Sequence, residues 1–264
     1  MSSERFDYTP SFYPDEETFK QYLGQTSYYL GLQSACLKIA ELANARHVLE
    51  LGLGTGATAI RLAIQLPDTH VVGVDNRKEM TTIATQRARE QAVNNVEFVV
   101  GDMRDHVDGI EAYDFVLMLY SFHHIPDPLG EKVRFLEECR KGLRPGARIC
   151  IAETFLPEST DEVTMRSQIR GLWSLRILEG YATTFWSALG GLSVPEIDRA
   201  RNAGKFSLEH EATAGEHVAN RADEYLVSRR WLCDTATAAG FSVDLSEPIN
   251  AVGDGVVVLS TPNS

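Results

Sequence analysis

From Arg46 onward, segments typical of β-strands alternate with segments typical of α-helices, and this alternation restricts the fold more than any other feature of the chain. Nearly continuous apolar runs predict strands at residues 47–53, 70–76, 96–102, 113–121 and 147–155. Helices are expected at residues 57–66, 79–93 and 129–143. Apolar strands interspersed with helices predict an α/β fold, in which helices cover both faces of a parallel sheet.

The C-terminal part changes this order. A helix that ends near residue 241 is followed by predicted strands at 242–249 and 256–262, with only a short turn between them. Two strands joined so closely must be antiparallel, because a parallel crossover needs a dozen or more residues. The sequence therefore predicts a mostly parallel sheet with an antiparallel final strand, which differs from the sheet of nicotinamide-dependent enzymes.

Two regions are expected to lie outside the sheet. Residues 1–45 are predicted to form a helical N-terminal cap, and residues 156–229 a helical insertion over the acceptor site, so that 46–155 and 230–264 make up the core. The cap carries five tyrosines, of which we expect most to pack and one hydroxyl to touch a ligand: Tyr8, Tyr13, Tyr22, Tyr28 and Tyr29. The insertion carries an apolar stripe that is typical of core packing but could also cover an acceptor or contact a second copy: Trp173, Ile177, Tyr181 and Phe185.

The stretch LELGLGTGA, residues 49–57, places three glycines directly after the first strand. Glycine lets the backbone turn sharply and lets a ligand lie against it, since there is no Cβ to push the ligand away. The pattern satisfies a dinucleotide fingerprint and equally a Glu-x-Gly-x-Gly-x-Gly pattern. Asp75 ends the second strand, where its carboxylate could accept hydrogen bonds from both ribose hydroxyls. These features indicate an adenosine ligand without deciding which one.

Glu50 separates the two alternatives. It lies near the end of the first strand, where a diphosphate would meet a negative charge in a low dielectric, whereas an ammonium or sulfonium group would be attracted. The alternative to a ligand-binding role is that the Glu50 carboxylate accepts hydrogen bonds only from local backbone amides. Asp102 adds a second carboxylate, at the end of the third strand, which could accept from an exocyclic amine such as that of adenine. Together these acids favour a cationic nucleoside.

Six landmarks occur in a fixed order: VLELGLGTG, VVGVDN, VEFVVGDM, YDFVLMLYSFHHIPD, LRPGARICIAE and AAGF. Over residues 46–155 and 230–262 the chain resembles the class I S-adenosylmethionine-dependent methyltransferases, in the branch that acts on small molecules. The resemblance implies a Rossmann-like seven-stranded sheet. It also implies S-adenosyl-L-methionine as cofactor and S-adenosyl-L-homocysteine as product.

The resemblance further implies which residues contact the cofactor. Glu50 and the glycines would lie near the methionine part, Asp75 on the ribose, and Asp102 with Met103 around the adenine. The full expected set follows the first four strands: Glu50, Gly52, Gly54, Thr55, Gly56, Asp75, Asn76, Gly101, Asp102, Met103 and Leu119.

The acceptor side is less defined. His123 and His124 follow the fourth strand and are candidate general bases, which methyl transfer needs only if the acceptor holds a proton at neutral pH. The alternative is a structural role with one imidazole near the cofactor. His210 and His217 would share one helical face, most simply a solvated one. The acidic cluster of metal-dependent catechol methyltransferases is missing, so we expect no metal.

Charge and composition restrict the classes of partner and substrate that we expect for this chain. The net charge of −12 disfavours nucleic acid, and no apolar run predicts a membrane span. The four cysteines form no CxxC pair, so we expect them to be reduced thiols of a cytoplasmic protein. We expect a methyltransferase for a small, hydrophobic or aromatic acceptor from specialised metabolism, which could form a homodimer. The acceptor atom stays open. The alternatives are S-adenosylmethionine chemistry other than methyl transfer, and a nicotinamide-dependent oxidoreductase.

Overall fold

The computed structural model describes residues 27–107, 109–126, 130–158, 163–164, 166–172, 174–175 and 226–262. Several residues singled out in the sequence lie outside this part of the chain: Tyr8, Tyr13, Tyr22, Trp173, Ile177, Tyr181, Phe185, His210 and His217.

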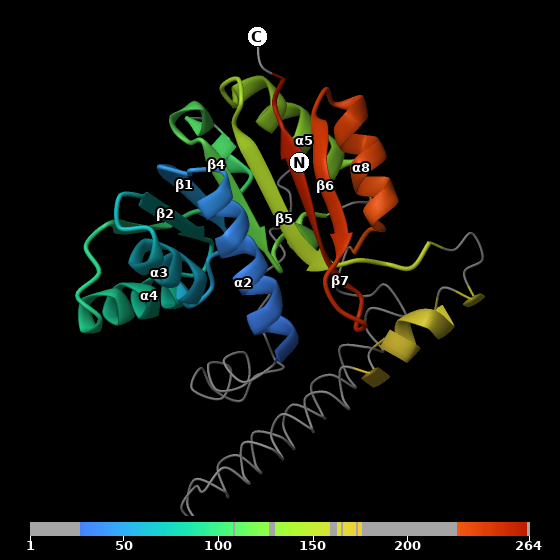
Figure 1. The fold of residues 1–264 in the computed structure, drawn as a ribbon, viewed down its shortest axis with the longest axis horizontal. Helices are drawn as coiled ribbons and strands as arrows, with labels where there is room; N and C mark the ends of the chain where they lie inside the picture. The colour runs from blue at the N-terminus through green and yellow to red at the C-terminus, as the bar shows by residue number, and fades with distance from the viewer. Residues whose placement is uncertain are drawn as a thin grey trace, which may run out of the picture.

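A seven-stranded sheet forms the centre of the molecule, with the strand order β3-β2-β1-β4-β5-β7-β6 (Figure 1). The strands are β1 (His47–Leu51), β2 (His70–Asp75), β3 (Val96–Val100), β4 (Phe115–Leu119), β5 (Arg148–Thr154), β6 (Ser242–Pro248) and β7 (Asp254–Ser260). Neighbouring strands from β3 to β5 are parallel, whereas β7 is antiparallel to both β5 and β6. The predicted mostly parallel sheet with an antiparallel final strand is confirmed.

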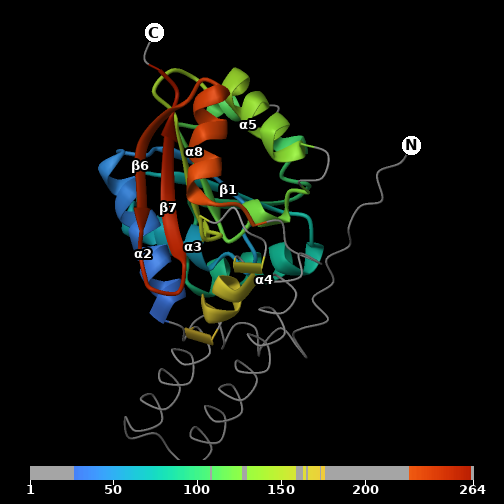
Figure 2. The ribbon, with the colours of Figure 1, turned by 90° about the vertical axis from the view of Figure 1, so that its right-hand side faces the viewer.

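Helices cover both faces of this sheet (Figures 1 and 2). The helices are α2 (Ser27–Leu42), α3 (Ala57–Gln65), α4 (Lys78–Glu90), α5 (Glu131–Gly142) and α8 (Arg229–Ala238). One hydrophobic core includes Leu32 of α2 and Leu62 of α3, and the core on the other face includes Phe135 of α5 and Leu232 of α8. The strands therefore bury side chains on both faces, which explains their nearly continuous apolar sequences.

Most of the predicted elements extended one to three residues too far, and at two of them a reversal of the backbone ends the element. The first strand ends at Leu51 and not at residue 53, because Gly52 takes a positive φ of 79° and turns the chain out of the sheet. The second predicted helix ends at Glu90 and not at residue 93, because Ala92 adopts a left-handed φ of 54°. In both places a local backbone reversal ends an element whose apolar pattern continues.

The two regions outside the sheet are described only in part. Helix α2 lies within the predicted N-terminal cap and packs on the sheet. Leu156 and Ser228 form an isolated parallel bridge, so the predicted insertion leaves and rejoins the core at one place. The boundaries of cap and insertion stay a prediction. Among the described residues, none of the helices has the length and apolar character needed to cross a bilayer.

Candidate functional site

The carboxyl ends of β1, β2, β3 and β4 meet at one edge of the sheet, and the loops at this edge carry the predicted cofactor residues. Asp75 ties two of these loops together. Its Oδ2 accepts a hydrogen bond from the backbone N–H of Gly54 at 2.9 Å, and its Oδ1 accepts from that of Arg77 at 2.9 Å. Burial raises the pKa of Asp75, while these amides oppose the shift. Asp75 is thus no solvent-facing turn residue, since it fixes the glycine loop.

The three glycines of the loop meet different surroundings. At Gly52, a Cβ would lie 2.4 Å from Cβ of Ser121, whose hydroxyl donates to the Leu51 carbonyl at 2.6 Å. At Gly56, a Cβ would lie 2.6 Å from Cβ of Ala84 on α4. At Gly54, φ is 53° and a Cβ would meet no atom within 4 Å. Two glycines therefore permit close packing, and the third leaves space beside the backbone.

Glu50 is buried, and its Oε2 has no hydrogen-bond partner among the described residues. Burial raises its pKa from 4.5 to about 8; the amide of Ala59 opposes this shift and the charge of Asp75 adds to it. A buried polar atom without a partner costs free energy. This observation goes against an acid satisfied by backbone amides alone. It fits a ligand that brings a positive charge or an N–H donor to the site.

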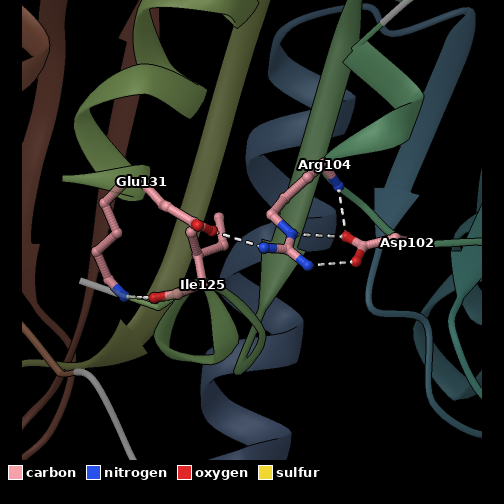
Figure 3. A network of polar contacts seen from close by, with 5 residues as sticks. Asp102, Arg104, Ile125 and Glu131 are labelled. Atoms are coloured by element: carbon pink, nitrogen blue, oxygen red, sulfur yellow. Dashed lines mark hydrogen bonds and ion pairs between the residues drawn. The ribbon is translucent and has the colours of Figure 1, made fainter. Parts of the chain in front are cut away.

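Asp102 is held by a residue that the sequence did not single out. Arg104 binds both oxygens of Asp102, at 3.0 Å through Nε and 2.7 Å through Nη2, and its Nη1 reaches Glu131 of α5 at 2.6 Å (Figure 3). These bonds outweigh desolvation and raise the pKa of Arg104 above its ordinary value. Arg104 thus fixes the direction in which the Asp102 carboxylate lies.

The other predicted cofactor residues lie around the same loops. Gly101 is packed under His106, since a Cβ there would lie 2.3 Å from Nε2 of that ring. The methyl group of Met103 is 3.6 Å from the position of a Cβ on Gly52. Thr55 is buried, and its hydroxyl accepts from Arg87 of α4 at 2.9 Å. Asn76 is exposed after β2, and Leu119 is buried at the end of β4. Thr55 is therefore part of the loop's support.

Helix α2 brings a tyrosine to this edge. Tyr29 stacks on Tyr120 with ring centroids 5.9 Å apart, and its hydroxyl lies 3.5 Å from Oγ1 of Thr58 on α3. Burial raises the pKa of Tyr29 to about 12; the bond to Thr58 opposes this and the nearby Glu50 adds to it. Tyr120, directly after β4, has a φ of 50°, which is strained for a residue with a side chain. Tyr29 is one of the cap tyrosines that were expected to pack, whereas Tyr120 was not singled out in the sequence.

The two candidate histidines lie on a short 3-10 helix, η3 (Phe122–His124). His123 is buried, and its Nδ1 lies 2.9 Å from Oε2 of Glu153 at the end of β5. The other oxygen of Glu153 accepts from the Thr154 amide at 3.0 Å. Glu153 was not among the predicted site residues, although an acid directly after the apolar run of β5 is a local signal for one.

His124 differs from His123 in its surroundings. Its ring centroid lies 4.0 Å from that of His123, and its side chain reaches solvent although much protein surrounds it. Desolvation, followed by the influence of His123 and Lys132, lowers the pKa of His124 well below its ordinary value. His124 is therefore neutral near pH 7.

Within the described residues, no group of three or more His, Cys, Asp or Glu side chains is placed to hold a metal ion.

Part of this chain is similar to known methyltransferases. Residues 48–146 match the family model described as "Methyltransferase domain". The uncharacterized methyltransferase YcgJ of Bacillus subtilis is 29% identical over 153 residues, which cover 58% of this chain and 55% of that protein. The tRNA (guanine-N(7)-)-methyltransferase of Rubrobacter xylanophilus is 29% identical, with 65% of this chain and 82% of that protein covered.

Similar architectures are found among solved structures. The magnesium protoporphyrin IX methyltransferase of Synechocystis, solved with bound S-adenosylmethionine, has a TM-score of 0.56 at 14% identity, covering 93% of this chain and 90% of the other. This likeness concerns the fold. The chain spans about half or less of the length of the first curated relatives that it matches.

Proposed function

We propose that this chain, whose residues 48–146 match a methyltransferase domain, is a class I S-adenosylmethionine-dependent methyltransferase that methylates a hydroxyl oxygen of a small organic molecule. The product of the cofactor would be S-adenosyl-L-homocysteine. The observation that carries the choice of acceptor atom is the buried pair of His123 and Glu153. An oxygen acceptor needs a base at neutral pH, whereas an amine nitrogen with a free lone pair does not.

The residues at the carboxyl ends of the strands fit S-adenosylmethionine. Glu50 would face its positive charge, because Oε2 of this buried carboxylate has no partner among the described residues. Asp75 would accept from the ribose hydroxyls, since each carboxylate oxygen can accept more than one hydrogen bond. Asp102 would accept from the adenine amine, and the space beside Gly54 would receive the ligand. When bound, the cofactor would supply a methyl group activated by a sulfonium, and the neutral thioether of S-adenosylhomocysteine would be the leaving group.

The chain's own contribution to the transfer is to place a base and to exclude water. Nδ1–H of His123 donates to Glu153, which leaves the lone pair on Nε2. Nε2 would take the hydroxyl proton as the oxygen attacks, and Glu153 would stabilise the imidazolium that forms. The same oxygen of Glu153 also accepts a hydrogen bond from the backbone N–H of His123 at 3.3 Å, which holds the backbone that carries the ring.

The size and character of the acceptor are part of the proposal. The net charge of −12 supports a small molecule over a nucleic acid, because so negative a surface repels phosphates. The names of the relatives do not decide this, since they include a tRNA methyltransferase and a porphyrin methyltransferase. We propose a hydrophobic or aromatic hydroxyl compound of specialised metabolism, methylated next to the stacked Tyr29 and Tyr120.

The test is an assay of the purified chain with S-adenosylmethionine and matched acceptors, such as phenols, the corresponding anilines and thiophenols, and methylated phenols. Mass spectrometry measures S-adenosylhomocysteine and the methylated product. We expect turnover with phenols, and a loss of at least a hundredfold for His123→Gln. Turnover with anilines that His123→Gln leaves unchanged would contradict an oxygen acceptor. Binding of S-adenosylmethionine without transfer to any acceptor would favour other chemistry, and tighter binding of NAD would favour an oxidoreductase.

A further inference from the structure

Helix α5 carries a lysine where its pattern calls for an apolar residue. Lys132 is completely buried, three and four positions before Phe135 and Leu136, which belong to the core on this face of the sheet. These spacings place the three side chains on one side of the helix. Burying an ammonium group is costly unless it makes specific polar contacts. The contacts of Lys132 are therefore informative about why it is there.

Lys132 holds the segment that carries the two histidines at both of its ends. Its Nζ donates a hydrogen bond to the backbone carbonyl of Ile125, the residue directly after η3. The same atom lies 5.2 Å from the centroid of the Phe122 ring, at the start of η3, in a cation–π contact. Phe122 and Ile125 flank His123 and His124 directly, so one buried charge is bound to both sides of the histidine pair.

The neighbouring residue of α5 reaches in another direction. Glu131 binds Arg104, which in turn holds both oxygens of Asp102 after β3 (Figure 3). The first turn of α5 therefore fixes the loop after β3 through Glu131 and the segment after β4 through Lys132. Figure 3 also draws the Ile125 carbonyl, which accepts the hydrogen bond from Lys132. The start of α5 is thus a common support for two loops of the site.

We propose that Lys132 is a positioning residue for the methyl transfer: by fixing Phe122 and Ile125 it sets the orientation of the His123 imidazole toward the acceptor. This inference rests on the proposed function, because it takes His123 as the base. Glu153 fixes the ring from β5, and Lys132 fixes the backbone that carries the ring from α5. Among the described residues, Glu153 faces His123, and His123 and Lys132 face His124.

The experiment compares Lys132→Met with Lys141→Met in the full chain. Both variants replace a lysine of α5 by an apolar residue of similar length, but Lys141 is exposed. For Lys132→Met we expect kcat to fall at least tenfold, while the Kd for S-adenosylmethionine in calorimetry changes less than twofold. We expect Lys141→Met to match the wild type in both. An unchanged kcat in Lys132→Met would overturn the proposal.

A second readout does not depend on turnover. Histidine NMR titrations, assigned with His123→Gln and His124→Gln, follow the two rings directly. In Lys132→Met we expect the pKa of His124 to rise and the signals of His123 to shift, whereas unchanged signals would overturn the proposal. If the wild type forms no S-adenosylhomocysteine, the proposed function fails while this readout still tests Lys132. Should Lys132→Met not fold, Phe122→Leu removes the ring contact alone, and wild-type signals and kcat in that variant would also count against the proposal.

Discussion

The imidazole Nδ1 of His123 lies 2.9 Å from Oε2 of Glu153, and both side chains are buried at the carboxyl ends of adjacent strands. A carboxylate in this position selects the tautomer with the proton on Nδ1 and stabilises the ring when it becomes charged. The contact with Glu153 therefore supports His123 as a candidate base, with Nε2 as the nitrogen that would accept a proton.

Glu153→Gln should lower kcat about tenfold to a hundredfold, because the amide keeps the size of the side chain but cannot stabilise an imidazolium. The Kd for S-adenosylmethionine should stay within twofold, since Glu153 is not among the expected cofactor contacts. Steady-state kinetics and calorimetry on the same preparation measure both quantities. A fall in affinity with an unchanged kcat would assign Glu153 to the cofactor site.

Asp75→Ala should weaken S-adenosylmethionine binding about tenfold or more, because it removes the proposed ribose contact and also the acceptor that holds the Gly54 amide. Asp68→Ala is the matched control, since Asp68 is exposed and pairs only with the exposed Arg46 at 3.1 Å in the described structure. Calorimetry gives both affinities, and circular dichroism checks the fold. Equal affinities in the two variants would exclude the ribose role.

Glu50 should make cofactor binding depend on pH. Its pKa of about 8 means that the carboxyl is largely protonated in the free protein at neutral pH, whereas a cationic ligand needs the carboxylate. Affinity for S-adenosylmethionine should therefore rise from pH 6 to pH 8, by up to about tenfold per pH unit. Glu50→Gln should bind more weakly at pH 8 and lose this rise. Calorimetry from pH 6 to pH 8 measures the affinity of both proteins. An identical pH profile in Glu50→Gln would refute a contact between Glu50 and the cationic ligand.

The same group should affect the stability of the ligand-free protein. Because the folded chain holds the Glu50 proton more tightly than the unfolded chain does, this residue lowers the free energy of unfolding as pH rises from 4.5 to about 8. Glu50→Gln should remove that loss, so the variant should gain stability relative to the wild type toward pH 8. Urea denaturation at pH 5 and pH 8 measures the difference. A gap between the two proteins that does not change with pH would contradict the raised pKa.

Gly52→Ala and Gly54→Ala should separate packing from binding. At Gly52 the new methyl group would lie 2.4 Å from Ser121, so this variant should lower the melting temperature by several degrees or prevent folding. At Gly54 the methyl group would meet open space, and only the backbone strain of about 1 kcal/mol should reduce stability. Gly54→Ala should nevertheless lose at least tenfold in S-adenosylmethionine affinity, because its Cβ would occupy the expected ligand position. Wild-type affinity in Gly54→Ala would place the ligand elsewhere.

Much of the fold was predictable because its signals are local. Apolar runs and helical spacing marked the strands and helices, and the short connection before β7 required an antiparallel strand. The ends of elements were less certain, since Gly52 and Ala92 reverse the backbone within apolar patterns that continue. The resemblance to the methyltransferase family implied the cofactor residues, and they come together because the ends of parallel strands meet at one edge of a sheet.

The partners of these residues could not be predicted in the same way. Arg104 lies two positions from Asp102, yet its bond to Glu131 joins residues 27 positions apart, and the His123–Glu153 contact joins residues 30 positions apart. The second contact depends on β4 lying beside β5, with Leu119 next to Ala152 in register. Such contacts depend on strand order and helix packing, which no local pattern specifies.

The amino-acid sequence by itself determined the type of sheet, the glycine loop and the acids Glu50, Asp75 and Asp102, because backbone preference and apolar periodicity act over a few residues. Only the tertiary structure decided that one oxygen of Glu50 lacks a partner among the described residues, that Glu153 orients His123, and that Lys132 holds both sides of the histidine pair. Burial and hydrogen bonding between distant segments exist only once the helices have packed on the sheet. The chemistry of the site therefore depends on contacts that the local sequence does not contain.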